Sequence, residues 1–530
     1  MTDTTTSGIV ARLLDRTAAD PERTFLTFED ERLSFERFTG LVGEMAALLA
    51  ASGVGRGDRV ALMLANDLGH AVLGYAVAWL GAVQVPVSVH LKRAGIELQL
   101  ADMQARVLVS DVVHREEVVD AAAATGTPIL WRLPADAFDA GAGRWLRIEV
   151  GAGSVVAAPG GAVPGPHLAT PGREALVSYT SGTTGRPKGA VLSERYLQLG
   201  ARNAARLASA GRDDVMFLWE PFYHLAGWAT LHLAVDLGAQ VAMVSRFSAS
   251  RCWDQVREAG ATKLHYLGGV LNLLLAQPPR DDDRDNPVTV AWGAAAPADR
   301  WREFERRFDL ELREGYGLSE AGNFVTLNIG GPVGSIGRPV EEFDAWVADP
   351  ASGERVTTGE VGELVVRPLE PGITMSHYFG DEERTAAVIR DGVVRTGDLV
   401  RMDEDGWFYF AGRVKDAIRR RGENVSAWEV ERVVNEHPAV ADCALVGVPS
   451  EMGEDDIKLF VRNREGTTIV LDDLFEWCVE RLAYYQVPRY FELVDELPYG
   501  PTQRVRKELL PRVTHGLKDF EPQLRARRSG

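Results

Sequence analysis

The sequence predicts an α/β fold with a large N-terminal domain of several sheets, residues 1–412, and a small α/β domain, residues 413–530. The chain has 530 residues, too many for one core, since soluble domains run roughly 100–200 residues each. Helical periodicity alternates with short β-rich runs over most of the length, which favours largely parallel sheets. Near residues 410–415 the strand-like sequence gives way to a charge-dense stretch, which marks the domain boundary.

The most apolar stretch, residues 71–89, illustrates how the elements are assigned. Gly81 interrupts it, so it predicts a core helix, a break and a short strand, and no membrane span. The expected elements in order are helix Leu41–Leu49, strand Arg59–Leu64, helix Val72–Leu80, strand Val83–Val89, strand Ala175–Tyr179, strand Trp407–Phe410, helix Val425–Asn435, strands Cys443–Val448 and Leu459–Val461, and helix Leu471–Leu482.

Charge and cysteine usage exclude several classes of protein. The formal charge of −18 repels phosphate backbones, so we expect no nucleic-acid partner. The three cysteines lie far apart and suit buried positions in a reducing cytosol, and the start of the chain has no secretory pattern, so we expect a cytoplasmic protein. The run Asp281–Asp283 predicts a solvated loop, and Arg525–Arg528 predicts a frayed tail.

The loop after strand Ala175–Tyr179 has the composition of a polyphosphate site. It reads Tyr-Thr-Ser-Gly-Thr-Thr-Gly-Arg-Pro-Lys-Gly over residues 179–189. Its glycines let backbone N–H groups face one point, and its hydroxyls and Lys188 surround that point. It is not the P-loop pattern, because Pro187 stands where Gly-Lys would follow Gly182. A flexible linker is the other interpretation, but it would not usually carry Arg-Pro-Lys-Gly between two strands.

This loop resembles the signature loop of the adenylate-forming superfamily, which includes acyl- and aryl-CoA synthetases, luciferases and peptide-synthetase adenylation domains. The likeness covers nearly the whole chain: residues 53–64 resemble the family's early strand entry, and residues 81–87 its next core strand. It implies an AMP- and acyl-binding N-terminal domain and a mobile C-terminal domain, in the acyl-CoA synthetase branch.

Residues 314–320, Glu-Gly-Tyr-Gly-Leu-Ser-Glu, resemble the family's adenine and metal segment. Tyr316 can stack on a purine, and the carboxylate of Glu320 suits Mg²⁺. Ser319, where the family usually has threonine, keeps a hydroxyl for the α-phosphate. The nucleotide-binding residues that the resemblance implies are Thr180, Ser181, Gly182, Thr183, Thr184, Gly293, Ala294, Ala295, Glu314, Gly315, Tyr316, Gly317, Ser319, Asp398 and Arg413.

Two later segments complete the implied nucleotide site. Residues 395–398 resemble the ribose-binding element, where ionised Asp398 can accept hydrogen bonds from both ribose hydroxyls. A turn-forming aspartate is the alternative. Residues 412–416 resemble the family's hinge, with Arg413 expected near the ribose and Lys415 at the pivot.

The acid is expected beside residues 221–228, where His224 resembles the side chain that closes the acyl site. Tyr223 and Trp228 lie in the same segment. Gly268 and Gly269 leave space for a bulky acid, although a tight turn at a helix start explains them equally well. Residues 419–424 resemble the loop along the pantetheine tunnel, with Arg421 and Gly422 as CoA-binding residues. This form resembles carnitine- and bile-acid-type CoA ligases more than fatty-acyl ones, which suggests a non-fatty acid.

One segment departs from the family. Residues 497–507 align with a Leu-Pro-x-Thr-x-x-Gly-Lys pattern whose lysine bridges the acyl carboxylate and the α-phosphate, but here Arg504 replaces that lysine. Arginine keeps the charge on a wider planar group. Three outcomes are open: Arg504 performs the step, Arg506 or Lys507 substitutes, or adenylation is slow.

The resemblance implies an ATP- and Mg²⁺-dependent carboxylate–CoA ligase that forms an acyl-adenylate and then an acyl-CoA. The catalytic residues that the resemblance implies are Lys188, His224 and Glu320, with Glu320 as the metal ligand, and Arg504 is our first choice for the C-terminal cation. ATP and CoA are co-substrates. Two alternatives stay open, a ligase that loads a carrier protein and a nucleotide-binding pseudoenzyme.

Overall fold

The computed structural model describes residues 8–132, 148–150, 154–156, 163–168, 172–180, 187–298, 300–350, 352–413, 418–420, 423–425, 427–450, 454–498, 505 and 507–528. The chain divides into two compact units. One unit comprises Met1–Val89, Glu97–Ser178 and Gly189–Gly412, and the other comprises His90–Ile96, Tyr179–Lys188 and Arg413–Gly530.

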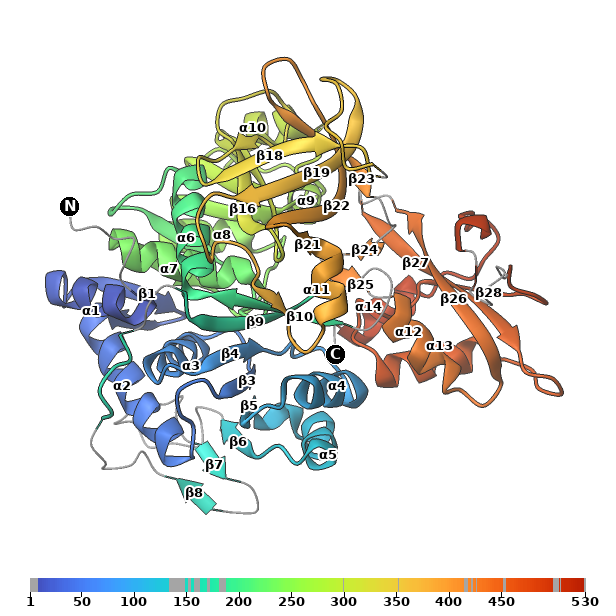
Figure 1. The fold of residues 1–530 in the computed structure, drawn as a ribbon, viewed down its shortest axis with the longest axis horizontal. Helices are drawn as coiled ribbons and strands as arrows, with labels where there is room; N and C mark the ends of the chain where they lie inside the picture. The colour runs from blue at the N-terminus through green and yellow to red at the C-terminus, as the bar shows by residue number, and fades with distance from the viewer. Residues whose placement is uncertain are drawn as a thin grey trace. The chain divides into compact units, whose positions relative to one another are not determined.

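A nine-stranded sheet of the larger unit supplies most of the described site residues (Figure 1). Its strand order is β17-β16-β15-β14-β13-β11-β12-β1-β2, and β11 to β15 run parallel to one another. The strands are β1 (Thr24–Phe28), β2 (Glu31–Ser34), β11 (Val215–Leu218), β12 (Gln240–Met243), β13 (Lys263–Leu267), β14 (Val290–Ala294), β15 (Glu311–Leu318), β16 (Gly322–Asn328) and β17 (Arg338–Pro339).

A second nine-stranded sheet has the order β20-β10-β9-β4-β3-β5-β6-β7-β8. A five-stranded sheet, β18-β19-β22-β21 with β23 on β22, completes the larger unit. These strands are β3 (Arg59–Met63), β4 (Val83–Pro86), β5 (Val107–Asp111), β6 (Ile129–Arg132), β7 (Ile148–Val150), β8 (Ser154–Val156), β9 (Glu174–Thr180), β10 (Lys188–Ser193), β18 (Phe343–Ala348), β19 (Val361–Pro368), β20 (His377–Tyr378), β21 (Ile389–Arg390), β22 (Val393–Met402) and β23 (Phe408–Arg413).

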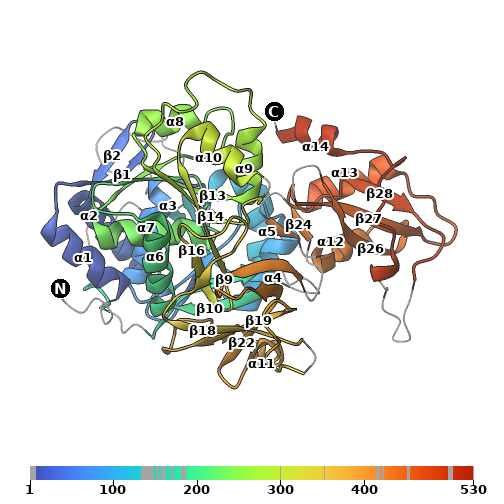
Figure 2. The ribbon, with the colours of Figure 1, turned by 90° about the horizontal axis from the view of Figure 1, so that it is seen from above.

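Helices of the larger unit share one core with strands of both nine-stranded sheets. Side-chain caps fix several helix starts: Ser34 accepts from the N–H of Arg37, and Asp67 from that of His70. Helix α6 lies beside β16 (Figure 2). The helices are α1 (Ile9–Ala19), α2 (Phe35–Ala51), α3 (Leu68–Trp79), α4 (Arg93–Met103), α5 (Arg115–Thr125), α6 (Glu194–Ala208), α7 (Leu225–Leu237), α8 (Cys252–Ala259), α9 (Gly268–Leu275), α10 (Trp301–Phe308) and α11 (Glu382–Val388).

Residues 413–530 form a small α/β core of their own. Strands β26, β27 and β28 make a three-stranded sheet that shares a core with α12, α13 and α14. Arg420 is buried there and donates to Asp456 at 3.0 Å. The elements are β24 (Ile418–Arg420), β25 (Glu423–Val425), α12 (Ala427–Asn435), β26 (Val440–Pro449), β27 (Asp455–Asn463), α13 (Leu471–Arg481), β28 (Tyr490–Leu493) and α14 (Glu521–Arg528).

Each helix and strand expected from the sequence is confirmed, with shifts at the ends. The largest shift is at the first expected helix, which begins at Phe35 and not at Leu41. At residue 425 the type of element changes, because residues 423–425 pair with 418–420 as a hairpin and the helix begins only at Ala427. The three cysteines are free and buried, as predicted. In the described part of the chain, no helix has both the length and the apolar character that crossing a membrane requires.

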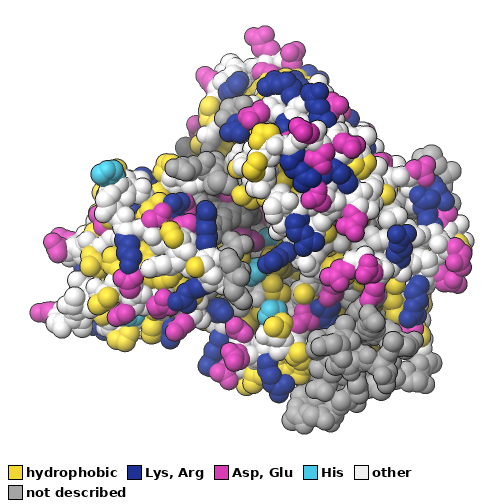
Figure 3. All heavy atoms as spheres, turned by 180° about the vertical axis from the view of Figure 1, so that it is seen from behind, with side chains coloured by type: hydrophobic (Ala, Val, Ile, Leu, Met, Phe, Trp, Pro, Cys, Tyr) yellow, Lys and Arg dark blue, Asp and Glu magenta, His cyan; other side chains and the backbone are white. Residues whose placement is uncertain are grey.

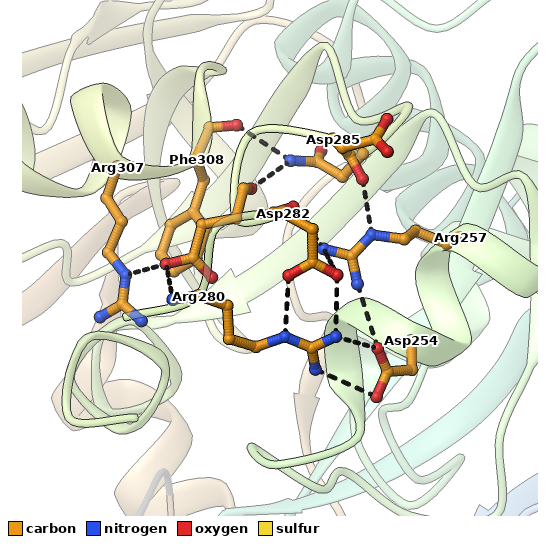
Figure 4. A network of polar contacts seen from close by, with 9 residues as sticks. Asp254, Arg257, Arg280, Asp282, Asp285, Arg307 and Phe308 are labelled. Atoms are coloured by element: carbon orange, nitrogen blue, oxygen red, sulfur yellow. Dashed lines mark hydrogen bonds and ion pairs between the residues drawn. The ribbon is translucent and has the colours of Figure 1, made fainter. Parts of the chain in front are cut away.

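The two charged runs are more ordered than the sequence predicted. Asp283 is buried and accepts from Arg307 at 2.8 Å, so the prediction of a solvated loop is wrong at this residue. Figure 4 shows Arg280 held between Asp282 and Asp254 in the same network. The predicted frayed tail is also wrong, since α14 extends to Arg528 and Arg527 pairs with Glu476. On the face drawn in Figure 3, acidic and basic side chains are interspersed.

Candidate active site

A buried glutamate holds the small-residue loop that follows β14. Both carboxylate oxygens of Glu314, on β15, accept backbone N–H groups, from Ala295 at 3.0 Å and from Ala296 at 3.1 Å. Burial raises the pKa of Glu314 to about 8, against the lowering effect of these two hydrogen bonds. Ala295 has a φ of 62°, an unusual conformation for a residue with a side chain. Glu314 therefore fixes a loop whose own backbone preferences oppose its shape.

Two glycines allow the ends of β13 and β14 to approach each other closely. A Cβ atom on Gly268 would lie 1.9 Å from the carbonyl oxygen of Ala295, and one on Gly293 would lie 1.9 Å from that of Tyr266. Gly268 begins helix α9, which agrees with the helix-start interpretation of this glycine. Gly268 can approach Ala295 this closely only because it has no side chain.

Tyr316 and Asp398, predicted from separate motifs, meet in the structure. The hydroxyl of Tyr316 donates to Oδ2 of Asp398 at 2.8 Å, and both residues are buried. Asp398 follows a turn held by Glu363, whose Oε1 accepts the N–H of Gly397 at 2.9 Å. The N–H of Asp398 donates to Oγ1 of Thr396 at 3.1 Å. These bonds fix both the backbone and the side chain of Asp398.

Glu320 is held by a residue that the sequence analysis did not identify. The hydroxyl of Tyr378, on β20, donates to Oε1 of Glu320 at 2.6 Å. Burial and the Glu320 charge raise the pKa of this tyrosine, which stays a hydrogen-bond donor. The backbone carbonyl of Glu320 accepts from the N–H of Met375 at 3.1 Å. Glu320 is partly exposed, so its carboxylate is fixed yet open to a ligand.

The segment expected beside the acid lies at the start of α7. His224 immediately precedes the helix with an extended backbone, and its ring lies 4.7 Å from that of Tyr223; both are partly exposed. Trp228 is buried and donates from Nε1 to the carbonyl of Phe222 at 2.7 Å. Its ring fills the place where a side chain on Gly74 would stand. Trp228 therefore packs in the core, while its neighbours Tyr223 and His224 reach solvent.

The remaining predicted residues are placed only in part. Ala294, Gly315, Gly317 and Ser319 lie on or directly after β14 and β15, Gly269 is partly exposed in α9, and Lys188 begins β10. Thr180 and Arg413 are described in backbone only, as ends of β9 and β23. Outside the described residues lie Ser181, Gly182, Thr183, Thr184, Lys415, Arg421, Gly422 and Arg504.

The sequence analysis did not identify the residues whose hydrogen bonds fix the predicted site residues. Tyr378 lies 58 residues from Glu320, and Glu363 lies 34 residues from Gly397. Neither stands within a motif that carries chemistry by itself. For Glu363 the signal is strand pairing, because β19 pairs with β22, which carries Gly397. Strand pairing gives no such signal for Tyr378, because β20 pairs with β10 whereas Glu320 follows β15.

Comparison with known proteins identifies the class. The family model for AMP-binding enzymes matches residues 14–379, and that for the AMP-binding enzyme C-terminal domain matches residues 429–503. The chain belongs to the AMP-binding enzyme family, in the acyl-CoA synthetase branch of the adenylate-forming superfamily, as the motifs predicted.

Individual relatives match over nearly their full length. Feruloyl-CoA synthase from an Amycolatopsis species is 32% identical over 499 residues, covering 93% of this chain and 96% of that one. Crotonobetaine/carnitine–CoA ligase from Salmonella arizonae is 28% identical over 510 residues, covering 92% and 96%. Among solved structures, an amide bond synthetase from Marinactinospora thermotolerans has a TM-score of 0.80 at 24% identity, covering 94% and 98%. ATP-bound MatB from Rhodopseudomonas palustris has a TM-score of 0.67 at 25% identity, covering 96% and 99%.

Proposed function

We propose that the protein is an ATP-dependent carboxylate–CoA ligase. The observation that carries the proposal is the full-length similarity to two enzymes named for joining an acid to CoA. In the first half-reaction the acid carboxylate attacks the α-phosphate of ATP and releases pyrophosphate. In the second, the CoA thiol attacks the carbonyl of the acyl-adenylate, forms the thioester and releases AMP.

The buried Tyr316–Asp398 pair supports nucleoside binding. Asp398 is held at its backbone and at one side-chain oxygen, and we assign its carboxylate to the ribose hydroxyls. Glu314 holds the loop that follows Gly293 and Ala294, through the N–H groups of Ala295 and Ala296, and we assign this loop to the adenine. We assign Lys188 and the hydroxyls of residues 180–184 to the phosphates.

The residues around Glu320 fit Mg²⁺ bound together with ATP. Mg²⁺ usually takes one or two carboxylates, with waters and substrate phosphates as its other ligands. Within the described ranges, no group of three or more His, Cys, Asp and Glu side chains could hold a metal ion. One fixed, partly exposed carboxylate therefore suits a metal that arrives with the nucleotide, where it would neutralise phosphate charge.

The C-terminal assignments are proposals from the sequence. We propose that residues 413–530 form a mobile domain that turns about Lys415, and that Arg504 bridges the carboxylate and the α-phosphate during adenylation. Arg421 and Gly422 are assigned to CoA, and His224 to the closed acyl site. Three free buried cysteines, together with ATP and CoA as substrates, support a place in the cytoplasm.

Two assays on the purified protein test the proposal. ATP–pyrophosphate exchange with a panel of short, aryl, fatty and steroid or terpenoid acids measures adenylation, and thioester formation with CoA measures the second step. We expect at least one acid to support both. Exchange without a CoA thioester, but with transfer to a phosphopantetheine carrier, would favour the carrier-loading alternative. No exchange with any acid would favour a pseudoenzyme.

Glu320→Gln provides the matched variant for this test. The substitution keeps the size of the side chain and its bond from Tyr378 but removes the charge that favours Mg²⁺. We expect exchange to fall by about 10²–10³-fold, since a positioned group that stabilises transition-state charge has an effect of this size. An unchanged rate would remove Glu320 from the metal site.

A further inference from the structure

Three buried polar side chains meet at the carboxyl end of the first sheet. Glu220 follows β11, His265 lies on β13, and Trp292 lies opposite it on β14, where the two residues pair in register. Their exposed fractions are 1%, 3% and 1%. These three residues are called the Glu220 cluster below.

The Glu220 cluster is held firmly on one side. Nδ1 of His265 bonds Oε1 of Glu220, and the centroids of the His265 and Trp292 rings are 4.4 Å apart. The indole N–H of Trp219 donates to the backbone carbonyl of His265 at 2.8 Å. These contacts leave the imidazole and the carboxylate little freedom to turn.

Two polar atoms of the cluster have no partner among the described residues. They are Oε2 of Glu220 and Nε1 of Trp292, and both are buried. Burying an unpaired polar atom costs free energy, so such atoms call for an explanation, and a ligand is one. A carboxylate oxygen can accept a hydrogen bond, and the indole N–H donates one.

The cluster is adjacent along the chain to the segments assigned to the acid. Glu220 immediately precedes residues 221–224, which carry Tyr223 and His224. His265 and Trp292 each stand two residues before the pair Leu267 and Ala294, which end β13 and β14. Gly268 and Ala295 follow directly. Side chains on one strand alternate between faces, so His265 shares the face of Leu267, and Trp292 that of Ala294.

We propose that the Glu220 cluster selects a carboxylic acid that carries a hydroxyl group at its far end. The hydroxyl donates to Oε2 of Glu220 and accepts from Nε1 of Trp292, so one group satisfies both buried atoms. An acid that lacks the hydroxyl leaves both atoms unpaired and binds less well. The inference rests on the proposed ligase function and names the substrate class for the same site.

Matched pairs of acids test the inference in the wild-type protein. The pairs are 4-hydroxycinnamate and cinnamate, 4-hydroxybenzoate and benzoate, and an ω-hydroxy fatty acid and its parent. For the skeleton that the site accepts, we expect kcat/KM in thioester formation to favour the hydroxylated acid by about 10²-fold. Thermal stabilisation by each acid in the absence of ATP gives a second measure, which does not depend on turnover.

Two variants test the assignment of the partners. Glu220→Gln can keep the bond to His265 while placing an amide N–H₂ where Oε2 accepted, and Trp292→Phe removes the indole N–H. In either variant we expect the preference for the hydroxyl to fall at least tenfold, mainly through slower reaction of the hydroxylated acid. Trp253→Phe is the control, because Nε1 of Trp253 is also buried without a partner but lies on α8. That variant should keep the wild-type preference.

The outcomes separate the inference from the proposed function. Exchange and thioester formation at equal rates with both members of each accepted pair would overturn the hydroxyl inference alone. A strong preference that survives both Glu220→Gln and Trp292→Phe would overturn the role of this cluster. No exchange with any acid would overturn the proposed function and the inference with it.

Discussion

The regions of the larger unit that we propose for the nucleotide and for the acid differ in how completely their buried polar groups are hydrogen-bonded. On the nucleotide side, Glu314 receives two backbone N–H groups and Asp398 receives the hydroxyl of Tyr316. On the acid side, Glu220 and Trp292 each keep one buried atom without a partner in the described part of the chain. Under the function proposed above, the fold itself completes the hydrogen bonds of the nucleotide site. It leaves those of the acid site incomplete until the acid binds.

Asp398→Ala is expected to have the largest effect, because it breaks the completed side. The substitution removes the acceptor that we propose for two ribose hydroxyls, and it removes the hydrogen bond that the buried Tyr316 hydroxyl donates. Hydrogen bonds to a charged group contribute about 1.5–3 kcal/mol each, so kcat/KM for ATP should fall at least ~10²-fold. Glu404→Ala, an exposed carboxylate after β22, is the control and should leave it unchanged. A wild-type value for Asp398→Ala would show that the pair serves only the fold.

The same comparison explains what the sequence could and could not predict. Tyr316 and Asp398 stand in short motifs of glycines, hydroxyls and carboxylates, and the chemistry of those residue types indicates a nucleotide site. Glu220 and His265 are 45 residues apart, and their contact exists only because β11 and β13 are neighbours in the sheet. Asp283 shows the same limit: its run of acidic residues predicts a solvated loop, but an arginine 24 residues later buries it.

Glu314→Gln tests the completed side through stability. The pKa of Glu314 is about 8 in the folded protein, above its usual 4.5, so the unfolded chain releases this proton at lower pH. The stabilisation that the neutral carboxyl adds to the free energy of unfolding is therefore fully present below pH 4.5 and is lost as pH rises to about 8. Relative to Glu314→Gln, which does not titrate, wild type should lose roughly 2–3 kcal/mol of unfolding free energy between pH 5 and pH 7.

Urea unfolding at the two pH values measures this difference. Glu354→Gln, at an exposed position, controls for general effects of removing a carboxylate and should show no such trend. If the difference between wild type and Glu314→Gln did not change with pH, the carboxyl would be ionised in the fold, held by its two backbone donors alone.

Gly268→Ala tests the place where the two sides meet. The added Cβ would lie 1.9 Å from the carbonyl of Ala295, so β13 or the loop held by Glu314 must move. We expect a loss of about 1–3 kcal/mol in stability, as for other overpacked sites, and a raised KM for ATP. Gly40→Ala is the control: Gly40 is exposed in α2 with open space around its Cβ position, and alanine should stabilise the helix slightly. Equal, small effects at both positions would show that the two sides are not coupled through this contact.

Tyr378→Phe is expected to have the smallest effect, and it asks whether a completed hydrogen bond on the nucleotide side serves the metal as well as the fold. Phenylalanine keeps the ring but removes the hydroxyl that donates to Glu320 at 2.6 Å, so the carboxylate is free to turn. Groups that orient a metal ligand typically change metal affinity by about 10–100-fold, and because Glu320 would be one ligand among phosphates and waters, we expect the lower end. The half-saturating Mg²⁺ concentration in ATP–pyrophosphate exchange should rise about tenfold, with the maximal rate recovered at high Mg²⁺.

Binding of Mn²⁺ in the presence of ATP, followed by its electron paramagnetic resonance signal, should weaken in parallel. Tyr409→Phe removes a comparable bond, to Asp403 at 3.0 Å, and should alter neither measurement. A lower maximal rate with an unchanged dependence on Mg²⁺ would instead show that Tyr378 maintains the structure of the site and does not orient Glu320 for the metal.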